Sequence, residues 1–180
     1  MISFRIGGFG KGSAWLNDRA GAQLPDVECE TLRLTSIAEH SPLSVHSVTF
    51  EINIGRGGVI SYGLLGIEFN PDPTLKQLVV EVPDNRFKSD RARTSPNVPS
   101  CEFATCGLLP EFIPSIVETI TAAATSKFSS GRLRISEAAC GSVGSSPNIF
   151  IQLTLRCIEV LLAPPCAAAE LVERVAHGFR

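Results

Sequence analysis

The longest helical pattern in the sequence covers residues 107–128. Its apolar residues recur at steps of three and four and so share one face of a helix, whereas Glu118 and its polar neighbours lie towards the other face. Pro110 and Pro114 lie near the start, where a missing N–H costs least. Such a broad apolar face needs a partner surface, so we expect this helix to pack on a sheet. The residues predicted to face that sheet are Leu109, Phe112, Ile113, Ile116, Val117, Ile120, Ala123 and Ala124.

Alternation of apolar and polar residues predicts strands before this helix and one strand after it. The clearest case is residues 45–54, where every second residue from Val48 to Ile54 is apolar. The glycine-rich segment 55–58 follows, so we expect a hairpin with residues 59–69. The further predicted strands cover residues 2–6, 27–37, 75–82 and 132–139.

Two more helices are predicted after the last strand. One begins at Pro147 and ends before Pro164, and a short one covers residues 167–176. The shared apolar face of the longer one consists of Ile149, Leu153, Cys157, Val160 and Leu161. This order of elements predicts an α+β two-layer sandwich, in which a mostly antiparallel sheet carries the two main helices on one face.

Length and composition suit one domain with its own core, since the chain has 180 residues, a mass of 19.2 kDa and 44% hydrophobic residues. We expect a domain over residues 24–165, an N-terminal extension over residues 1–23 and a helical tail over residues 166–180. No apolar run reaches the length that spans a bilayer, and the first residues lack the apolar core of a secretory signal. These features predict a soluble, cytoplasmic protein with no membrane partner.

The charge balance leaves room only for a local nucleic-acid site, because 16 basic and 18 acidic side chains give a formal net charge of −2. The main basic cluster lies in residues 86–100, among serines and prolines. This composition predicts an exposed, mobile loop. The loop either holds a phosphate backbone or an acidic partner, or is only a solvated connection.

Two segments come close to catalytic motifs without completing them. A phosphate-binding loop at Lys11 would need a glycine in place of Arg5 and a hydroxyl residue directly after the lysine, so we expect a glycine-rich turn there and no GTP. At Ser142, Cys140 replaces the first glycine of the Gly-x-Ser-x-Gly motif, which favours a polar turn over a serine nucleophile. The imidazoles that could serve as its base are His40, His46 and His177. We therefore expect no enzyme.

The six cysteines show no metal-binding spacing, and none has a histidine at ligand distance along the chain. They are expected to be reduced packing residues. The sequence thus predicts no metal and no cofactor.

Four segments match a known family in their order and spacing. Residues 109–117, LPEFIPSIV, are similar to a helix opening Leu-Pro-x-x-aromatic-Ile-Pro-x-Val, which is the most specific match. Residues 25–32, PDVECETL, resemble an opening strand, and GRGG at 55–58 with EFNP at 68–71 resembles a hairpin turn and the strand that follows it. Residues 143–146, VGSS, followed by Phe150, are similar to a loop and helix start. Together these segments resemble domain IV of elongation factor G and related translational GTPases, over about residues 24–163.

This resemblance implies the ribosomal protein S5 domain 2-like fold, in which the strand–helix–strand crossover is left-handed. It implies a non-catalytic binding module that contacts RNA or the ribosome, without the family's GTPase domain. The residues expected to make the contact are Arg86, Lys88, Arg91, Arg93, Arg132 and Arg134.

An alternative function follows from a departure from the family. Residues 140–146 lack the His and Asp that the family carries in this loop, and the sequence pI is acidic, about 5.9. Both features favour a protein-interaction or self-associating domain that has no RNA role.

Overall fold

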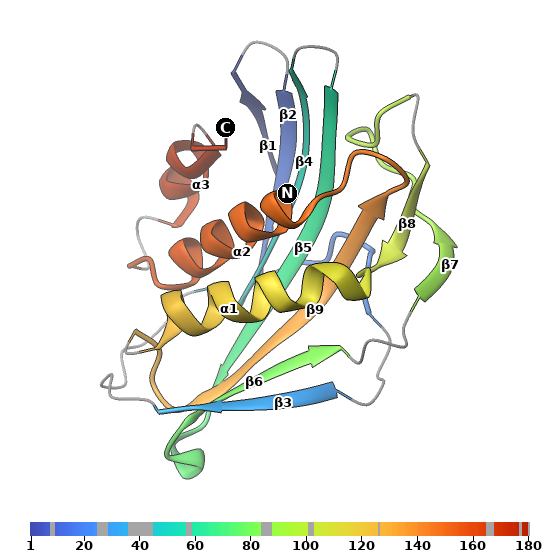
Figure 1. Cartoon of the computed structure of the whole chain (residues 1–180). Coiled ribbons are helices and arrows are strands. Elements are labelled where there is room, and N and C mark those ends of the chain that lie inside the picture. Colours follow the sequence, from blue (N-terminus) through green and yellow to red (C-terminus); the bar gives the residue numbers. More distant parts are fainter. Residues whose placement is uncertain are drawn as a thin grey trace.

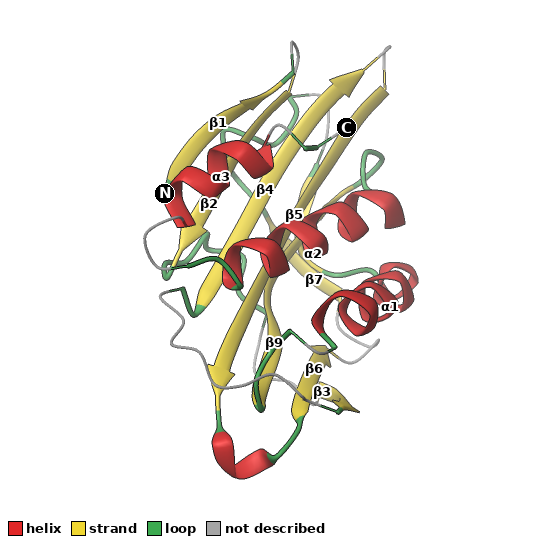
Figure 2. Ribbon diagram, turned by 90° about the vertical axis from the view of Figure 1, so that its left-hand side faces the viewer, coloured by secondary structure: helices red, strands yellow, loops and turns green. Residues whose placement is uncertain are grey.

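The computed structural model is described for residues 1–7, 10–24, 29–35, 45–56, 59–83, 88–100, 103–125, 127–164, 168–176 and 178–179. One open sheet runs through the molecule, and helices cover one of its faces (Figures 1 and 2). We call the other side the open face. Two irregular segments, residues 17–24 and 93–100, cross part of it.

The described residues form a nine-stranded sheet in the order β1-β2-β4-β5-β9-β6-β3, with β8 beside the end of β9 and β7 beside β8. The β6–β9 pair is parallel and the other pairs among the described strands are antiparallel, which confirms the predicted α+β class with a mostly antiparallel sheet. The strands are β1 (Ile2–Ile6), β2 (Gly10–Leu16), β3 (Cys29–Leu34), β4 (Ser47–Arg56), β5 (Val59–Pro71), β6 (Leu78–Pro83), β7 (Lys88–Ala92), β8 (Ala104–Gly107) and β9 (Gly131–Gly141).

Three α-helices lie on the covered face: α1 (Ile113–Ala124), α2 (Pro147–Leu161) and α3 (Ala168–Ala176). A 3-10 turn, η2 (Pro110–Phe112), leads into α1, and another, η1 (Pro73–Leu75), joins β5 to β6. The helices α1 and α2 pack side by side, and α2 also packs on β4 and β5, as the sequence predicted (Figure 1). The third helix contacts α2 and β1.

The parallel strands β6 and β9 are joined through β7, β8 and then α1. Viewed from the helical side, β9 lies to the left of β6 when both strands point upward (Figure 1). The crossover through α1 is therefore left-handed, against the usual preference for right-handed connections.

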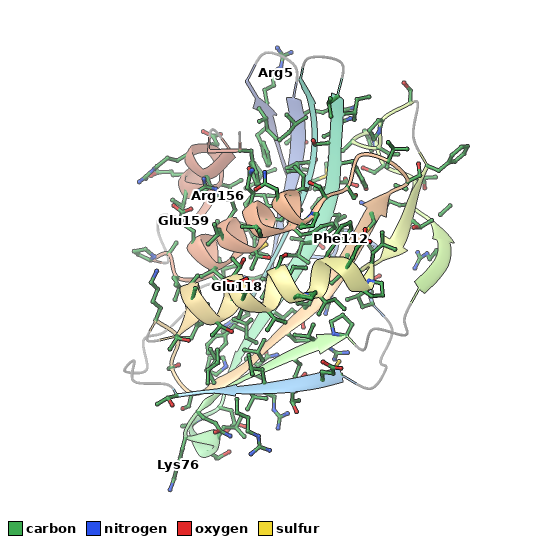
Figure 3. All side chains as sticks on the ribbon, in the orientation of Figure 1. Arg5, Lys76, Phe112, Glu118, Arg156 and Glu159 are labelled. Carbon is green, nitrogen blue, oxygen red and sulfur yellow. The ribbon has the colours of Figure 1, made fainter. Side chains whose placement is uncertain are left out.

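The main core lies between the helices and the sheet. Ile116, Ile120, Leu153 and Cys157 are fully buried there. Phe112 stacks on Phe150 with ring centroids 4.8 Å apart, whereas Glu118 lies on the outer face of α1 (Figure 3). Val117 is only partly buried, so the prediction that it would be inaccessible is wrong. It packs against the main core without being enclosed by it.

Three strands were missed because tertiary pairing overrides a weak local pattern. Gly10 and Gly12, expected in a flexible turn, lie in β2 and pair with β4. The predicted exposed loop at residues 86–100 instead contains β7, and Asn97 farther along is buried. Within the described part of the chain, no helix is long and apolar enough to cross a membrane.

Candidate functional site

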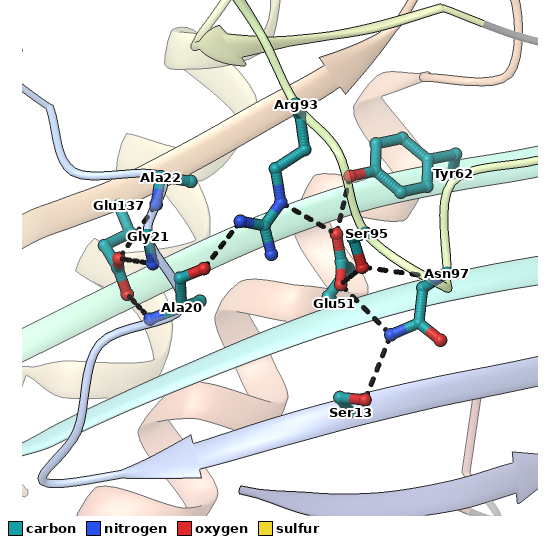
Figure 4. A network of polar contacts seen from close by, with 10 residues as sticks. All are labelled: Ser13, Ala20, Gly21, Ala22, Glu51, Tyr62, Arg93, Ser95, Asn97 and Glu137. Carbon is teal, nitrogen blue, oxygen red and sulfur yellow. Dashed lines mark hydrogen bonds and ion pairs between the residues drawn. The ribbon is translucent and has the colours of Figure 1, made fainter.

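A fully buried carboxylate, Glu137, lies on the open face beneath segment 17–24. Its Oε1 accepts hydrogen bonds from the backbone N–H groups of Gly21 and Ala22, at 2.9 and 3.1 Å (Figure 4). Its Oε2 accepts from the Ala20 N–H at 3.0 Å and from the Thr49 hydroxyl at 2.8 Å. Charge-assisted bonds of this kind are the stronger ones in proteins, so Glu137 holds the segment in place.

A β-bulge brings Glu137 to this position. The register between β5 and β9 shifts after Gly66, so that Ser136 has no residue opposite it in β5 and Glu137 lies opposite Gly66. A Cβ on Gly66 would collide with Thr49 Oγ1 and would lie 3.0 Å from the Cβ of Glu137. Glycine is therefore required for the Thr49 hydroxyl to reach Glu137 across β5.

A second buried carboxylate, Glu51 on β4, receives four side-chain hydrogen bonds. Tyr62 donates to Oε1 at 2.8 Å and Arg93 Nε at 3.1 Å, while Ser95 and Asn97 donate to Oε2 at 2.5 and 3.0 Å (Figure 4). Burial, and then the negative charge of Glu51, raises the pKa of Tyr62 far above its usual value. The phenol therefore stays protonated and donates to the carboxylate.

Arg93 links the two carboxylate sites. Its side chain is 9% exposed, and its Nη1 donates to the carbonyl of Ala20 at 2.5 Å (Figure 4). The guanidinium is thus directed into the molecule, where it fixes segment 93–100 against segment 17–24. Both carboxylates are buried and bonded within the fold, and the exposed charged groups of the open face lie elsewhere.

Farther along the open face, two cross-strand rows cross β3, β6, β9 and β5. The first row is Arg33, Val79, Arg132 and Asn70. The second row is Thr31, Glu81, Arg134 and Glu68. The row between them is Leu32, Val80, Leu133 and Phe69, which belongs to the main core. Because side chains alternate across a sheet, both outer rows face the open side.

These rows, with Arg19 from segment 17–24, form a surface that we call the arginine face: Arg19, Arg33, Arg132 and Arg134 with Glu68 and Glu81. Arg132 Nη1 lies 3.0 Å from Glu81 Oε1, and its side chain is still 51% exposed. Arg19 pairs with Glu68 and is also 51% exposed. Exposed ion pairs of this kind are weak, so the guanidinium groups can exchange partners.

A pocket of about 360 Å³ opens on the arginine face. Its lining residues are Arg19, Gln23, Leu24, Glu68, Arg134 and Ser136. The bulge in β9 and the anchoring of segment 17–24 by Glu137 both build this pocket, because they place Ser136 and the residues around Leu24 at its wall.

The predicted contact residues are only partly brought together. Arg132 and Arg134 lie two residues apart on β9, one in each of the two rows of the arginine face. Arg91 is exposed on β7, next to Ala92, which pairs through Thr105 of β8 with Cys140, about 20 Å along β9 from Arg134 at 3.3 Å per residue. Arg86 and the side chain of Lys88 lie outside the described residues.

Arg19 and Arg33 were missed as site residues. Arg33 could have been found, because it stands in a predicted strand whose apolar neighbours fix its outward direction. Arg19 could not, because its position depends on the contact between segment 17–24 and Glu137, more than a hundred residues away.

Ser142 and His46, considered as a nucleophile and base, are both exposed and lie at opposite ends of β5. Gly144 near Ser142 accepts a hydrogen bond from Tyr62 N–H, whereas the His46 carbonyl accepts one from Phe69 N–H. Seven residues of strand, about 23 Å, separate these points. Burial raises the pKa of the nearby Cys140 thiol to about 12, which keeps it protonated at neutral pH. His40 and His177 lie outside the described residues.

Four cysteines, at positions 29, 106, 140 and 157, are free thiols, and no group of metal-binding side chains occurs among the described residues. Comparison with known proteins adds no identification, since no family model, no curated protein and no solved structure matches this chain.

Proposed function

We propose that this chain is a non-catalytic binding module of the translation-factor domain IV type, which contacts structured RNA or the ribosome in the cytoplasm through the arginine face. One observation carries the proposal. The strand register places Arg33, Arg132 and Arg134 on one side of the sheet, next to Arg19, while the helices occupy the other side.

The fold features that accompany the sequence motifs support this proposal. The motif at residues 109–117 forms η2 and the start of α1, and Gly55 and Arg56 of the GRGG motif form the end of β4, paired with the start of β5. The left-handed crossover through α1 is the uncommon feature that the resemblance implies (Figure 1). Under this proposal the contact surface lies on the sheet, with Arg132 and Arg134 of the predicted set, and not in the loop at residues 86–93.

The chemistry of the arginine face suits phosphate groups. A guanidinium presents a planar fork of N–H donors that matches two phosphate oxygens. Neutralising phosphates releases condensed counterions, so the observed affinity falls with salt at a slope of about −0.9 per phosphate on duplex nucleic acid. Such contacts position a partner on the sheet without reading its sequence.

Titration with ribosomes and with a structured RNA hairpin at several salt concentrations tests the proposal. We expect binding at low salt that weakens steeply as salt rises. The Arg132→Ala/Arg134→Ala variant should reduce the salt slope by about 2, since it removes two phosphate contacts. Arg174→Ala, at an exposed site on α3, is the matched control and should leave the slope unchanged. Absence of binding at low salt, or binding independent of salt, would overturn the proposal.

A second candidate function, protein interaction without RNA, is favoured by a pair of exposed apolar side chains. Phe103 is 84% exposed and Val143 is 88% exposed. They lie near one another, because Ser142 N–H donates to the carbonyl of Phe103 at 2.8 Å. Large exposed apolar side chains that lie together mark interaction sites. Under this alternative, Phe103→Ser weakens association with a protein partner or a second copy, and the Arg132→Ala/Arg134→Ala variant does not.

A further inference from the structure

The pocket on the arginine face carries mixed charge. Arg19 and Arg134 lie on its wall together with the carboxylate of Glu68, and Gln23 and Ser136 add neutral polar groups. A bare phosphate would meet Glu68 as well as the guanidinium groups, and the like charges of phosphate and carboxylate repel. The pocket therefore favours a ligand that offers both acceptor oxygens and N–H donors.

We propose that this pocket binds one unpaired guanosine nucleotide of an RNA, with the N–H groups of the base donating to Glu68 and the phosphate accepting from Arg19. This inference rests on the proposed RNA-binding function and names what the same face recognises. Guanine carries two adjacent N–H donor groups on its Watson–Crick edge, and a carboxylate with two acceptor oxygens can receive both. Unpaired bases in RNA loops are recognised through this edge.

The size of the pocket agrees with a single nucleotide. Its volume of about 360 Å³ lies near the lower end of the 300–1,000 Å³ that small-molecule sites occupy. A base pair would hide the Watson–Crick edge, so the nucleotide has to be unpaired. Leu24 supplies an apolar wall for the base, and Arg134, directly opposite Glu68 in the strand register, supplies a guanidinium plane on which a base can stack.

The carboxylate of Glu68 can exchange its contact with Arg19 for a contact with the base. Glu68 is 19% exposed, and its Oε1 receives no hydrogen bond from a described residue. Arg19 Nη1 lies next to this oxygen as an ion pair, without hydrogen-bond geometry. When Arg19, which is 51% exposed, turns away, the base can take its place at Glu68. The freed guanidinium then lies close enough to the same nucleotide to bind its phosphate.

Binding of single-stranded heptamers to the intact chain at low salt tests this inference. The probes are UUUGUUU, UUUAUUU and UUUIUUU, in which inosine lacks the 2-amino group of guanosine. We expect the guanosine heptamer to bind about tenfold more tightly than the adenosine heptamer, because one bidentate contact to a base favours the matching base over another by about this factor. Inosine should lie between them, because it keeps one of the two N–H donors.

Glu68→Gln and Glu81→Gln form a matched pair of variants, since each removes one negative charge from the arginine face and frees one arginine. Glu68→Gln should abolish the guanosine preference and keep the salt-dependent affinity, whereas Glu81→Gln should keep the preference. Equal binding of the guanosine and adenosine heptamers to the parent chain overturns the inference, as does an equal loss of preference in both variants. Binding of the structured hairpin would then still support the proposed function. Absence of all RNA binding would refute both the proposed function and the guanosine site.

Discussion

Replacing Glu137 by glutamine tests how the fold holds the segment that carries Arg19. The substitution keeps the size of the side chain and changes only its charge and one hydrogen-bonding atom. In the parent chain the N–H of Ala20 bonds to Oε2 of Glu137 at 3.0 Å. If the amide oxygen of the variant keeps the bonds from Gly21 and Ala22, its new NH₂ group faces this N–H. Two donors then face each other in a buried position.

The magnitude follows from the four hydrogen bonds. An unpaired buried N–H costs about 1–3 kcal/mol, and each remaining bond loses about 1 kcal/mol when its acceptor is no longer charged. The neutral amide also avoids the desolvation of a buried carboxylate, which offsets part of this loss. We therefore expect the free energy of unfolding to fall by about 2 kcal/mol.

Urea unfolding measures this change as a lower transition midpoint at an unchanged slope. A loss of about 2 kcal/mol moves the midpoint by about 1 M for a slope near 2 kcal/mol/M. Hydrogen exchange should be faster at the amide of Ala20 than in the parent chain. Glu118→Gln, on the outer face of α1, is the control and should shift the midpoint little. A Glu137→Gln chain as stable as the parent would show that these bonds do not anchor the segment.

Three further predictions concern stability and reactivity. Ile116→Ala should cost about 2–5 kcal/mol in urea unfolding, because the fully buried side chain leaves a cavity; parent-like stability would contradict the packing of α1. Gly66→Ala should destabilise the chain and speed exchange in segment 17–24, because the new Cβ collides with Thr49; an unchanged chain would show that β5 can move aside. Iodoacetamide at pH 8 should leave Cys140 unmodified in the native chain and alkylate it in urea, because burial raises its pKa to about 12; rapid native labelling at Cys140 would refute its protected state.

The sequence by itself determined the main helices, most of the strands and the class of the fold. Residues 113–124 and 147–161 carry a strong three-and-four spacing, and β4 carries a clear alternation. These patterns reflect burial on one face, a property that each segment shows in its own residues. The strand pattern of residues 132–139 also places Arg132 and Arg134 on one side of β9.

Only the tertiary structure decided which residues form the site. Gly10 and Gly12 are poor strand formers, yet they extend the sheet because β4 supplies the pairing partner. Arg93 was expected at the surface and instead lies against Glu51, and Arg19 reaches the arginine face because Glu137 holds its segment. Such contacts join residues far apart along the chain, and their energy depends on buried geometry that no local pattern encodes.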